Sequence, residues 1–256
     1  MKRIVTLASL VIIWSVMTIA QSPQRHVRVL FIGDSITDGG WGRSGGSMAS
    51  SEERNQKDLN HIYGHGYMEM TAAHFLSTRP SEDYQFFNRG ISGNTLADLH
   101  ARWEKDALAL HPDIVSILVG TNDADCFLRE NGQKTFDQKQ WKEEYRKLIE
   151  ELRKQNPQVK IVIGTPFVAK AGRIGKQDNY AQRADLIVRM GEAVKELAIE
   201  ENAICIPYGE MFAWLQKNSP RPDYWIWDGI HPTTAGHRRM ADLWIEKAGT
   251  LFKDSL

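Results

Sequence analysis

Two short motifs in this sequence contain the side chains of a serine nucleophile and its proton acceptor. Ser35 lies in the stretch Gly33–Asp38 (GDSITD), and Asp228 precedes His231 by three residues near the C-terminus. A carboxylate bound to Nδ1 orients an imidazole so that its Nε2 can take the proton of a serine hydroxyl. The DxxH spacing can supply both groups from one turn, so we interpret Ser35, His231 and Asp228 as a candidate catalytic triad.

Two further motifs could donate hydrogen bonds to the oxyanion that forms when a carbonyl is attacked. Gly90 lies in Asn88–Asn94 (NRGISGN), and without a Cβ its N–H can approach a ligand oxygen closely. Asn122, in the stretch GTND, offers a side-chain amide, and the backbone N–H of Ser35 is a third candidate donor. Taken alone, the Ser35 and Gly90 motifs are better explained as a helix cap and a glycine-rich turn, and the Asn122 motif is explained equally well as a turn or a cap. Their combination points to one site.

Five apolar runs alternate with helical patterns and predict the elements that would position these motifs. The runs are too continuous in apolar content for half-exposed strands, so we expect helices on both faces of the sheet. Strands separated by helices form a parallel sheet, and ligands bind where its strands end. The runs cover residues 27–33, 84–91, 114–120, 159–166 and 203–208, and the helical stripes lie around residues 145–152, 187–197 and 240–251.

Two polar stretches are long for connections between a strand and a helix. Residues 39–66 and 167–179 both follow predicted strands, and each carries charged or small polar residues. Long loops at the ends of parallel strands carry function more often than those at the opposite edge. We therefore expect both stretches to lie near the site.

The four motifs together resemble the SGNH (GDSL) hydrolase superfamily. The matching blocks are FIGDSITD, NRGISGNT, GTND and DGIHPTTAGH, and the resemblance extends from about Val27 to Phe252. It implies a flavodoxin-like three-layer α/β/α sandwich with a five-stranded parallel sheet in the order 2-1-3-4-5. It also implies a shallow, open active site and no cofactor. The residues that it assigns to the site are Ser35, Gly90, Asn122 and His231, with Asn94 bracing the loop that carries Gly90.

Within the superfamily, the stretches GISGNTLADLHARWEKD and WDGIHPTTAGH look most like the bacterial acetylxylan esterases. The resemblance implies a serine esterase that removes acetyl groups from xylan or a related poly- or oligosaccharide. Aromatic rings that could stack on sugars are Trp41, Tyr224, Trp225 and Trp227, although such rings also pack loops against sheets.

Two other functions stay open at this point. A lysophospholipase or thioesterase would need an apolar acyl groove, whereas the long loops here are polar. An inactive carbohydrate-binding scaffold is disfavoured because every catalytic position of the family's motifs is intact.

Residues 1–20 have the pattern of a signal peptide. Lys2 and Arg3 precede an apolar run that ends with small residues at Thr18 and Ala20. We expect cleavage after Ala20, export to the periplasm or beyond, and one hydrolase domain over residues 21–256. The alternative is an uncleaved N-terminal anchor, because about 17 apolar residues reach the lower limit of a membrane span. After cleavage we expect no stable association with a membrane.

The charge and the cysteine content argue against a nucleic-acid partner and against a disulfide. The chain has 32 basic and 32 acidic residues, so no overall field favours nucleic acid. Cys205 falls in a predicted strand and Cys126 in a predicted loop two strand positions away. That separation exceeds the reach of a disulfide, so we expect two free thiols. Association with a second copy of the chain stays open.

The remaining candidate residues point to structural roles. Asp34 and Asp38 have no histidine at a metal-ligand spacing, and capping explains them better. His61 and His65 are four residues apart, but the neighbouring glycines favour a loop over a shared helix face. We therefore predict no metal site. His237, inside the last helix, is expected to be solvated.

Overall fold

The sheet at the centre of the structure has five parallel strands in the order β2-β1-β3-β4-β5. The computed structural model describes residues 26–40, 62–129 and 135–252. Each strand lies within its predicted apolar run, and the order agrees with the expected one. The strands are β1 (Val27–Gly33), β2 (Tyr84–Gly90), β3 (Ile114–Leu118), β4 (Lys160–Gly164) and β5 (Ile204–Ile206).

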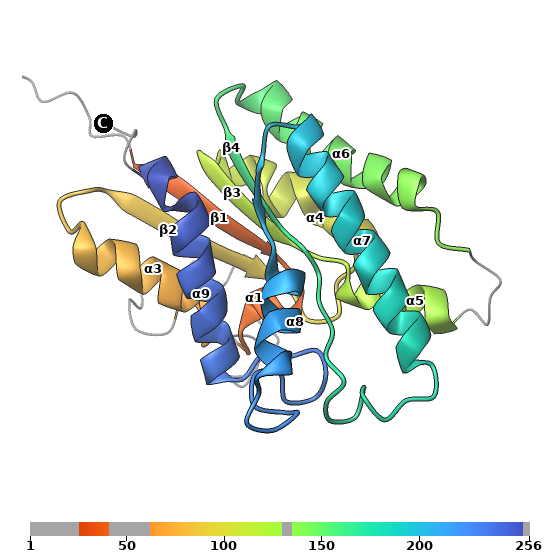
Figure 1. Cartoon of the computed structure of the whole chain (residues 1–256). Coiled ribbons are helices and arrows are strands. Elements are labelled where there is room, and N and C mark those ends of the chain that lie inside the picture. Colours follow the sequence, from red (N-terminus) through yellow and green to blue (C-terminus); the bar gives the residue numbers. More distant parts are fainter. Residues whose placement is uncertain (1–25, 41–61, 130–134, 253–256) are drawn as a thin grey trace, which may run out of the picture.

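Helices cover both faces of this sheet, as Figure 1 shows. One layer contains α3 (Tyr67–Thr78), α8 (Tyr208–Lys217) and α9 (Thr234–Ala248). The opposite layer contains α4 (Leu96–Asp106), α6 (Gln138–Gln155) and α7 (Tyr180–Glu200). The short helices α1 (Ser35–Asp38) and α5 (Thr121–Arg129) come soon after β1 and β3, and 3₁₀ turns cover Leu108–Leu110 and Gly249–Phe252. The three-layer α/β/α sandwich is confirmed.

Strand β1 shows why both faces need a helical layer. Val29 and Phe31 belong to the core beneath α3 and α9, whereas Leu30 and Ile32 belong to the core beneath α4 and α6. All four side chains are completely buried. Successive residues of a strand point to opposite faces, so a continuous apolar run is stable only between two layers. Each such side chain contributes about 1.5–3 kcal/mol by its burial.

The predicted helical stripes form the buried faces of the long helices. Trp244 adds a specific contact, because its indole N–H donates to the hydroxyl of Ser116 on β3 at 3.0 Å. This bond holds α9 against the sheet, and α9 begins just after the candidate base His231. The buried stripe residues are Tyr145, Leu148, Ile149 and Leu152 on α6, Ile187, Met190, Val194 and Leu197 on α7, and Met240, Trp244 and Ala248 on α9.

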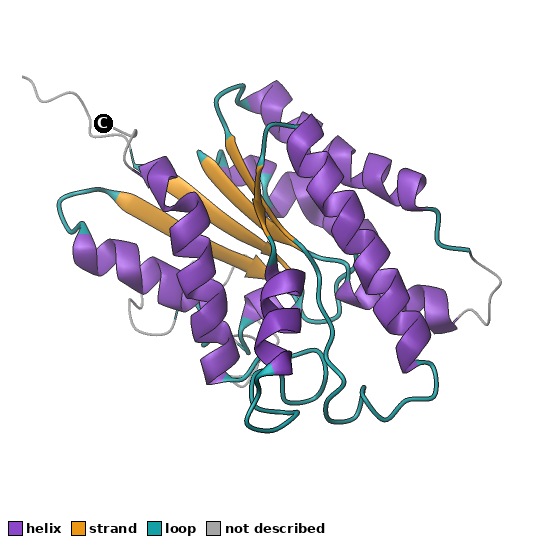
Figure 2. Cartoon of the chain, in the orientation of Figure 1, coloured by secondary structure: helices purple, strands orange, loops and turns teal. Residues whose placement is uncertain are grey.

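The loops that follow the strands gather at one edge of the sheet, beyond the arrowheads in Figure 2. The polar stretch 167–179 lies there and has an apolar side, since Phe167, Ala169, Ala171 and Ile174 are buried. Most of the other long stretch, residues 39–66, falls outside the described residues. So does the predicted signal peptide. Within the described ranges, no helix has the length and apolar character needed to cross a bilayer.

Both cysteines are free thiols, as expected. Cys205 lies on β5, but Cys126 lies on α5 and not in a loop as predicted. The chain turns sharply at Gly120, whose φ of +127° favours glycine, and α5 begins at the next residue.

Candidate active site

The turn after β1 presents Ser35 at the edge of the sheet. Ser35 is the first residue of α1, and the Asp34 carboxylate caps this helix by accepting the Ile36 N–H at 2.9 Å. A Cβ on Gly33 would lie 2.1 Å from the carbonyl oxygen of Leu118, so only glycine fits here. Burial raises the pKa of Asp34 to about 7. Asp34 thus has the capping role expected from the sequence.

The three side chains predicted as a triad form a continuous chain of hydrogen bonds. Ser35 Oγ lies 2.9 Å from His231 Nε2, and His231 Nδ1 lies 2.9 Å from Asp228 Oδ2. Asp228 Oδ1 accepts the backbone N–H groups of Ile230 at 3.0 Å and His231 at 2.8 Å. With a carboxylate on Nδ1, the imidazole carries its proton there and can accept the Ser35 proton at Nε2.

The Asp228 carboxyl is buried and yet remains ionised. Burial alone would raise its pKa, but hydrogen bonds from the His231 ring and from the two backbone N–H groups outweigh that effect. The pKa of Asp228 therefore lies well below its ordinary value. Arg173, which is largely exposed, places Nη2 3.3 Å from Asp228 Oδ2. Asp228 is thus a permanent anion beside the His231 ring at neutral pH.

The stretch 167–179 supports the turn that carries this pair. Backbone N–H groups of Ala169 and Ile174 donate to the carbonyls of Gly229 and Asp228 at 2.9 and 3.0 Å. Gly229 has φ +101°, and a Cβ there would lie 2.5 Å from the Ile174 Cβ. Glycine is therefore required in the DGIH turn. The predicted placement of this stretch beside the site is confirmed by these contacts.

The structure contradicts Gly90 as an oxyanion donor. Its N–H already donates to the Asn88 side-chain oxygen at 2.9 Å, and the residue is buried. A Cβ on Gly90 would lie 2.2 Å from the Asp38 nitrogen, so this glycine allows β2 to pack against α1. The Asn88 amide completes the contact by donating to the Thr37 carbonyl at 2.9 Å. Gly90 therefore has a packing role.

Asn122 is oriented by a backbone group of the loop after β2. Its Nδ2 donates to the Asn94 carbonyl at 3.0 Å, which leaves the second amide hydrogen for a ligand. The adjacent Gly93 is exposed and has φ +85°, and no described atom lies within 4 Å of the place that a Cβ would occupy. Its N–H has no hydrogen-bond partner in the described part of the chain. Sequence reasoning missed Gly93, although the second glycine of NRGISGN was visible.

Arg102 on α4 joins the loop after β2 to the turn that carries Ser35. Its Nε donates to Asn94 Oδ1 at 2.7 Å, and Nη2 donates to the Gly33 carbonyl at 3.1 Å. The third contact, Nη1 to Asp106 Oδ2 at 2.8 Å, holds the guanidinium on its own helix. Asn94 was expected to brace its loop, and it does so by joining Arg102 to Asn122.

Ser35 and His231 open onto a cavity of about 340 Å³. Among the residues predicted to stack on sugars, Trp227 lines it. The Trp227 side chain is 57 % exposed, and its ring lies nearly parallel to that of His231 with centroids 6.3 Å apart. The lining residues are Ser35, Asp38, Gly39, Gly40, Ser92, Arg173, Trp227, Asp228, His231 and His237.

Tyr224 and Trp225, two of the other predicted aromatic residues, are not among the residues that line this cavity. Tyr224 and Trp225 pack edge to face with ring centroids 4.7 Å apart, and Trp225 also packs against the core. The Tyr224 carbonyl accepts the Thr233 hydroxyl at 2.7 Å, just before α9. The backbone of this loop is therefore bonded to the residue before α9, and Trp225 packs against the core, which is the alternative that the sequence left open. Trp41 lies outside the described residues.

His237 is buried, so its predicted solvation is wrong. Its side chain lines the cavity, and its Nδ1 accepts the backbone N–H of Tyr67 at 3.1 Å. The N-terminus of α3 packs against this ring. The apolar pattern of the last helix did not predict that contact. Burial, with a smaller effect of the nearby His231, lowers the pKa of His237 to about 4.

The low pKa of His237 makes stability depend on pH. The unfolded value is about 6.5, so the unfolded chain takes up this proton first as the pH falls. The contribution of neutral His237 to the free energy of unfolding is therefore fully present above about pH 6.5. It decreases by about 3 kcal/mol as the pH falls to 4. Asp34, with its raised pKa, acts in the opposite direction. The measurement is therefore the difference in free energy of unfolding between wild type and His237→Asn, in urea at pH 7.5 and pH 4. A difference that does not change with pH would contradict the prediction.

The described residues contain no group of three or more side chains arranged to hold a metal ion. His61, one of the two histidines considered for such a role, lies outside the described residues. His65 lies in a bend before α3.

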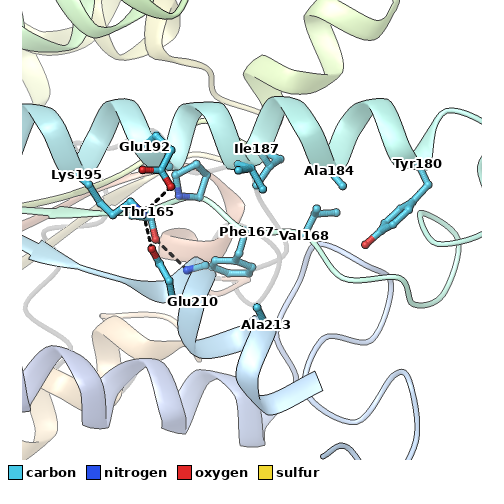
Figure 3. Close-up of a pocket in the computed structure, with 14 residues that line it drawn as sticks. Thr165, Phe167, Val168, Tyr180, Ala184, Ile187, Glu192, Lys195, Glu210 and Ala213 are labelled. Carbon is cyan, nitrogen blue, oxygen red and sulfur yellow. Dashed lines mark hydrogen bonds and ion pairs between the residues drawn. The ribbon is translucent and has the colours of Figure 1, made fainter. Parts of the chain in front are cut away.

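A second cavity of about 270 Å³ lies between α7 and α8 and shares no lining residue with the first. Figure 3 shows apolar side chains along it, with Tyr180 at one end. At the other end, Lys195 donates to Glu192 at 2.6 Å and to Glu210 at 2.8 Å. None of the predicted site residues contacts it, so we place the candidate site at Ser35.

Known proteins resemble this chain over most of its length. Residues 31–239 match the model of the GDSL-like Lipase/Acylhydrolase family. An acetylxylan esterase of Geobacillus stearothermophilus is 32% identical over 225 residues, which are 87% of this chain and 94% of the relative.

Solved structures of similar proteins also resemble this chain over most of its length. A putative GDSL-like lipase from Parabacteroides merdae has a TM-score of 0.74 at 31% identity, covering 87% of this chain and 95% of its own. The acetylxylan esterase Axe2 from Geobacillus stearothermophilus has a TM-score of 0.68 at 28% identity, with 86% and 93% covered. With these matches and the fold described above, the chain belongs to the GDSL-like lipase/acylhydrolase family and is a carboxylic ester hydrolase.

Proposed function

We propose that this chain is an exported serine esterase that removes O-acetyl groups from carbohydrate, with xylan or a related poly- or oligosaccharide as substrate. The observation that carries the proposal is the hydrogen-bonded chain from Ser35 through His231 to Asp228 at an open cavity. The choice of substrate is supported by the 32% identity to an acetylxylan esterase.

The proposed reaction has two halves linked by an acetyl-enzyme. In the first, His231 Nε2 accepts the Ser35 proton while Oγ bonds to the acetyl carbonyl carbon. The bond to the sugar oxygen then breaks, and His231 returns the proton to that oxygen. In the second half, water loses a proton to His231 as it attacks the acetyl group, and acetate leaves as His231 returns that proton to Ser35 Oγ. Asp228 stays ionised and stabilises the imidazolium formed in each half.

The oxyanion in this mechanism needs donors that are not already bonded. Within the described ranges, the Ser35 N–H at the start of α1 and the second amide hydrogen of Asn122 meet this condition. In place of Gly90, we propose the N–H of Gly93, which follows the cavity-lining Ser92. These groups act in a site shaped before the reaction, and that preorganisation is what lowers the barrier.

The variant Asn122→Ala is expected to reduce kcat by about 10²–10³-fold, because one oxyanion donor is lost. The KM for the same ester should change little, since the contact strengthens as charge develops on the oxygen. Steady-state kinetics on p-nitrophenyl acetate measures both constants. The exposed Asn218, at the end of α8, provides a matched control as Asn218→Ala. A kcat within threefold of wild type would remove Asn122 from the proposed mechanism.

Acetate release across a panel of acetylated glycans tests the substrate class. We expect release from acetylated xylan and xylooligosaccharides, with Ser35→Ala as the inactive control. Trp227 is proposed as a stacking surface for the sugar because its exposed ring borders the cavity. Absence of release from every acetylated carbohydrate would contradict the proposal.

A chain-length series of p-nitrophenyl esters separates a deacetylase from a lipid acyl hydrolase. A deacetylase should prefer the acetate ester sharply, whereas a lysophospholipase or thioesterase should prefer long acyl chains. Reaction of Ser35 with a fluorophosphonate would argue against an inactive binding scaffold.

Export is proposed from the sequence of residues 1–20, which has the charge and apolar pattern of a signal peptide. The mature N-terminus of protein recovered from the periplasm or medium should be Gln21. Retention of residues 1–20 in a membrane fraction would instead support the N-terminal anchor.

A further inference from the structure

A second imidazole lines the cavity that contains Ser35 and His231. His237 lies near the start of α9, and its side chain is 9 % exposed. The mechanism proposed above does not use it. Its environment determines which of its nitrogens carries a proton, and therefore what it can do in the cavity.

The N-terminus of α3 fixes the tautomer of His237. The backbone N–H of Tyr67, the first residue of α3, donates to His237 Nδ1 at 3.1 Å. A backbone N–H can only donate, so Nδ1 carries no hydrogen and the neutral ring has its hydrogen on Nε2. The N-cap residue Gly66 has no side chain that could accept this N–H, so the imidazole acts as the capping acceptor in its place.

The charged form of His237 is disfavoured by the same contact. Protonation would place a second N–H against that of Tyr67 and a positive charge at a helix N-terminus. Burial also lowers the pKa of the ring to about 4. The ring is therefore a neutral hydrogen-bond donor that cannot act as a base through Nδ1.

Neighbouring groups hold the ring in place. It stacks on the Tyr67 ring with an interplanar angle of 5° and centroids 6.5 Å apart. Gly66 packs against its edge, since a Cβ there would lie 3.3 Å from Cε1 and 3.4 Å from Nδ1. Nε2 has no hydrogen-bond partner among residues 26–40, 62–129 and 135–252. Nε2–H is therefore the one polar group of the ring left for a ligand.

We propose that His237 Nε2–H donates a hydrogen bond to a hydroxyl oxygen of the sugar that carries the acetyl group. This inference rests on the proposed function. The acetyl carbonyl already has Ser35 and Asn122 as donors, and the acetyl methyl group accepts nothing. The acceptors that remain in the substrate are the sugar oxygens. A buried donor left unpaired is costly, so the contact selects esters of carbohydrates over esters of apolar or aromatic alcohols.

Two substitutions separate the two roles of His237, which are the Nε2–H donor and the Nδ1 acceptor that caps α3. In His237→Asn, the amide oxygen can take the position of Nδ1 and still accept the Tyr67 N–H, but nothing replaces Nε2–H. In His237→Gln, the longer amide reaches the position of Nε2 and keeps a donor there, but the cap is lost. The substrates are an acetylated xylooligosaccharide and p-nitrophenyl acetate, which has no sugar oxygen.

We expect His237→Asn to lower kcat/KM on the acetylated xylooligosaccharide by about tenfold, the effect of one hydrogen bond. On p-nitrophenyl acetate it should stay within twofold of wild type, and its Tm at pH 7.5 should be nearly unchanged. His237→Gln should show the reverse pattern, with a lower Tm and the sugar ester turned over within threefold of wild type. Equal losses of His237→Asn on both substrates, or no loss on the sugar ester, would overturn the inference.

A second measurement leaves position 237 unchanged. In Ser35→Ala, the ¹⁵N shifts of His237 should show the Nε2–H tautomer, and the Nε2 signal should move when the acetylated xylooligosaccharide is added. An Nδ1–H tautomer, or no movement at saturating ligand, would overturn the inference. If wild type releases no acetate from any acetylated sugar, the proposed function fails and the inference fails with it. If wild type is active and His237→Asn is unimpaired, the inference alone fails.

Discussion

Ser35→Ala is expected to abolish esterase activity while leaving the fold intact. The hydroxyl forms the bond to the acetyl carbon, and no other group in the described cavity lies in hydrogen-bond contact with His231 Nε2. Removing the nucleophile of a triad lowers kcat by at least about 10⁴-fold. The Ser35 side chain contacts His231 and not the core, so we expect a Tm within about 1–2 °C of wild type. The measurements are acetate release and thermal unfolding.

The matched control is Ser77→Ala, which removes an exposed hydroxyl near the end of α3. It should keep full activity. Fluorophosphonate labelling should follow the same division, with wild type and Ser77→Ala labelled and Ser35→Ala unlabelled. Activity of purified Ser35→Ala above one-tenth of wild type would show that another residue is the nucleophile.

Asp228→Asn is expected to lower kcat by about 10⁴-fold, through the tautomer of His231. Asp228 Oδ1 accepts two backbone N–H groups, from Ile230 and His231. An asparagine must therefore place its oxygen at that position and its NH₂ group toward His231 Nδ1. The imidazole then accepts at Nδ1 and carries its hydrogen on Nε2. In that state it cannot take the proton of Ser35.

This prediction is measured by kcat on p-nitrophenyl acetate, with folding followed by thermal unfolding. The control Asp223→Asn changes an exposed carboxylate in the loop that precedes the turn. It should leave kcat within twofold. If Asp228→Asn keeps more than one-tenth of the wild-type kcat, the Asp228 carboxylate does not set the His231 tautomer.

Much of the fold follows from local sequence. The apolar runs are strands because side chains on both faces of a parallel strand must be buried, as Val29 and Leu30 show in opposite cores. Ser35 and Asn122 come shortly after two of these strands. Since parallel strands end at the same edge, the placement of both residues at that edge could be predicted without a structure.

Glycine and aromatic residues near the site were harder to assign. NRGISGN contains two glycines, and the sequence alone does not reveal which N–H is available. The side chain of Asn88 folds back and takes the Gly90 N–H, so Gly93 becomes the candidate donor. Similarly, Trp225 and Trp227 are neighbours in a loop, but Trp225 packs against the core while Trp227 borders the cavity.

The sequence by itself determined the sheet and the four side chains Ser35, Asn122, Asp228 and His231, because each lies in a contiguous motif whose local turn positions it. The tertiary structure alone decided the state of His237 and the choice between Gly90 and Gly93. Those depend on hydrogen bonds and packing: His237 meets Tyr67, which lies 170 residues away in the chain, and Gly90 packs against the backbone of Asp38. A local sequence pattern does not reveal a partner that is distant in the chain. The position of the proton on His237 and the availability of each glycine N–H can therefore be seen only in the folded structure.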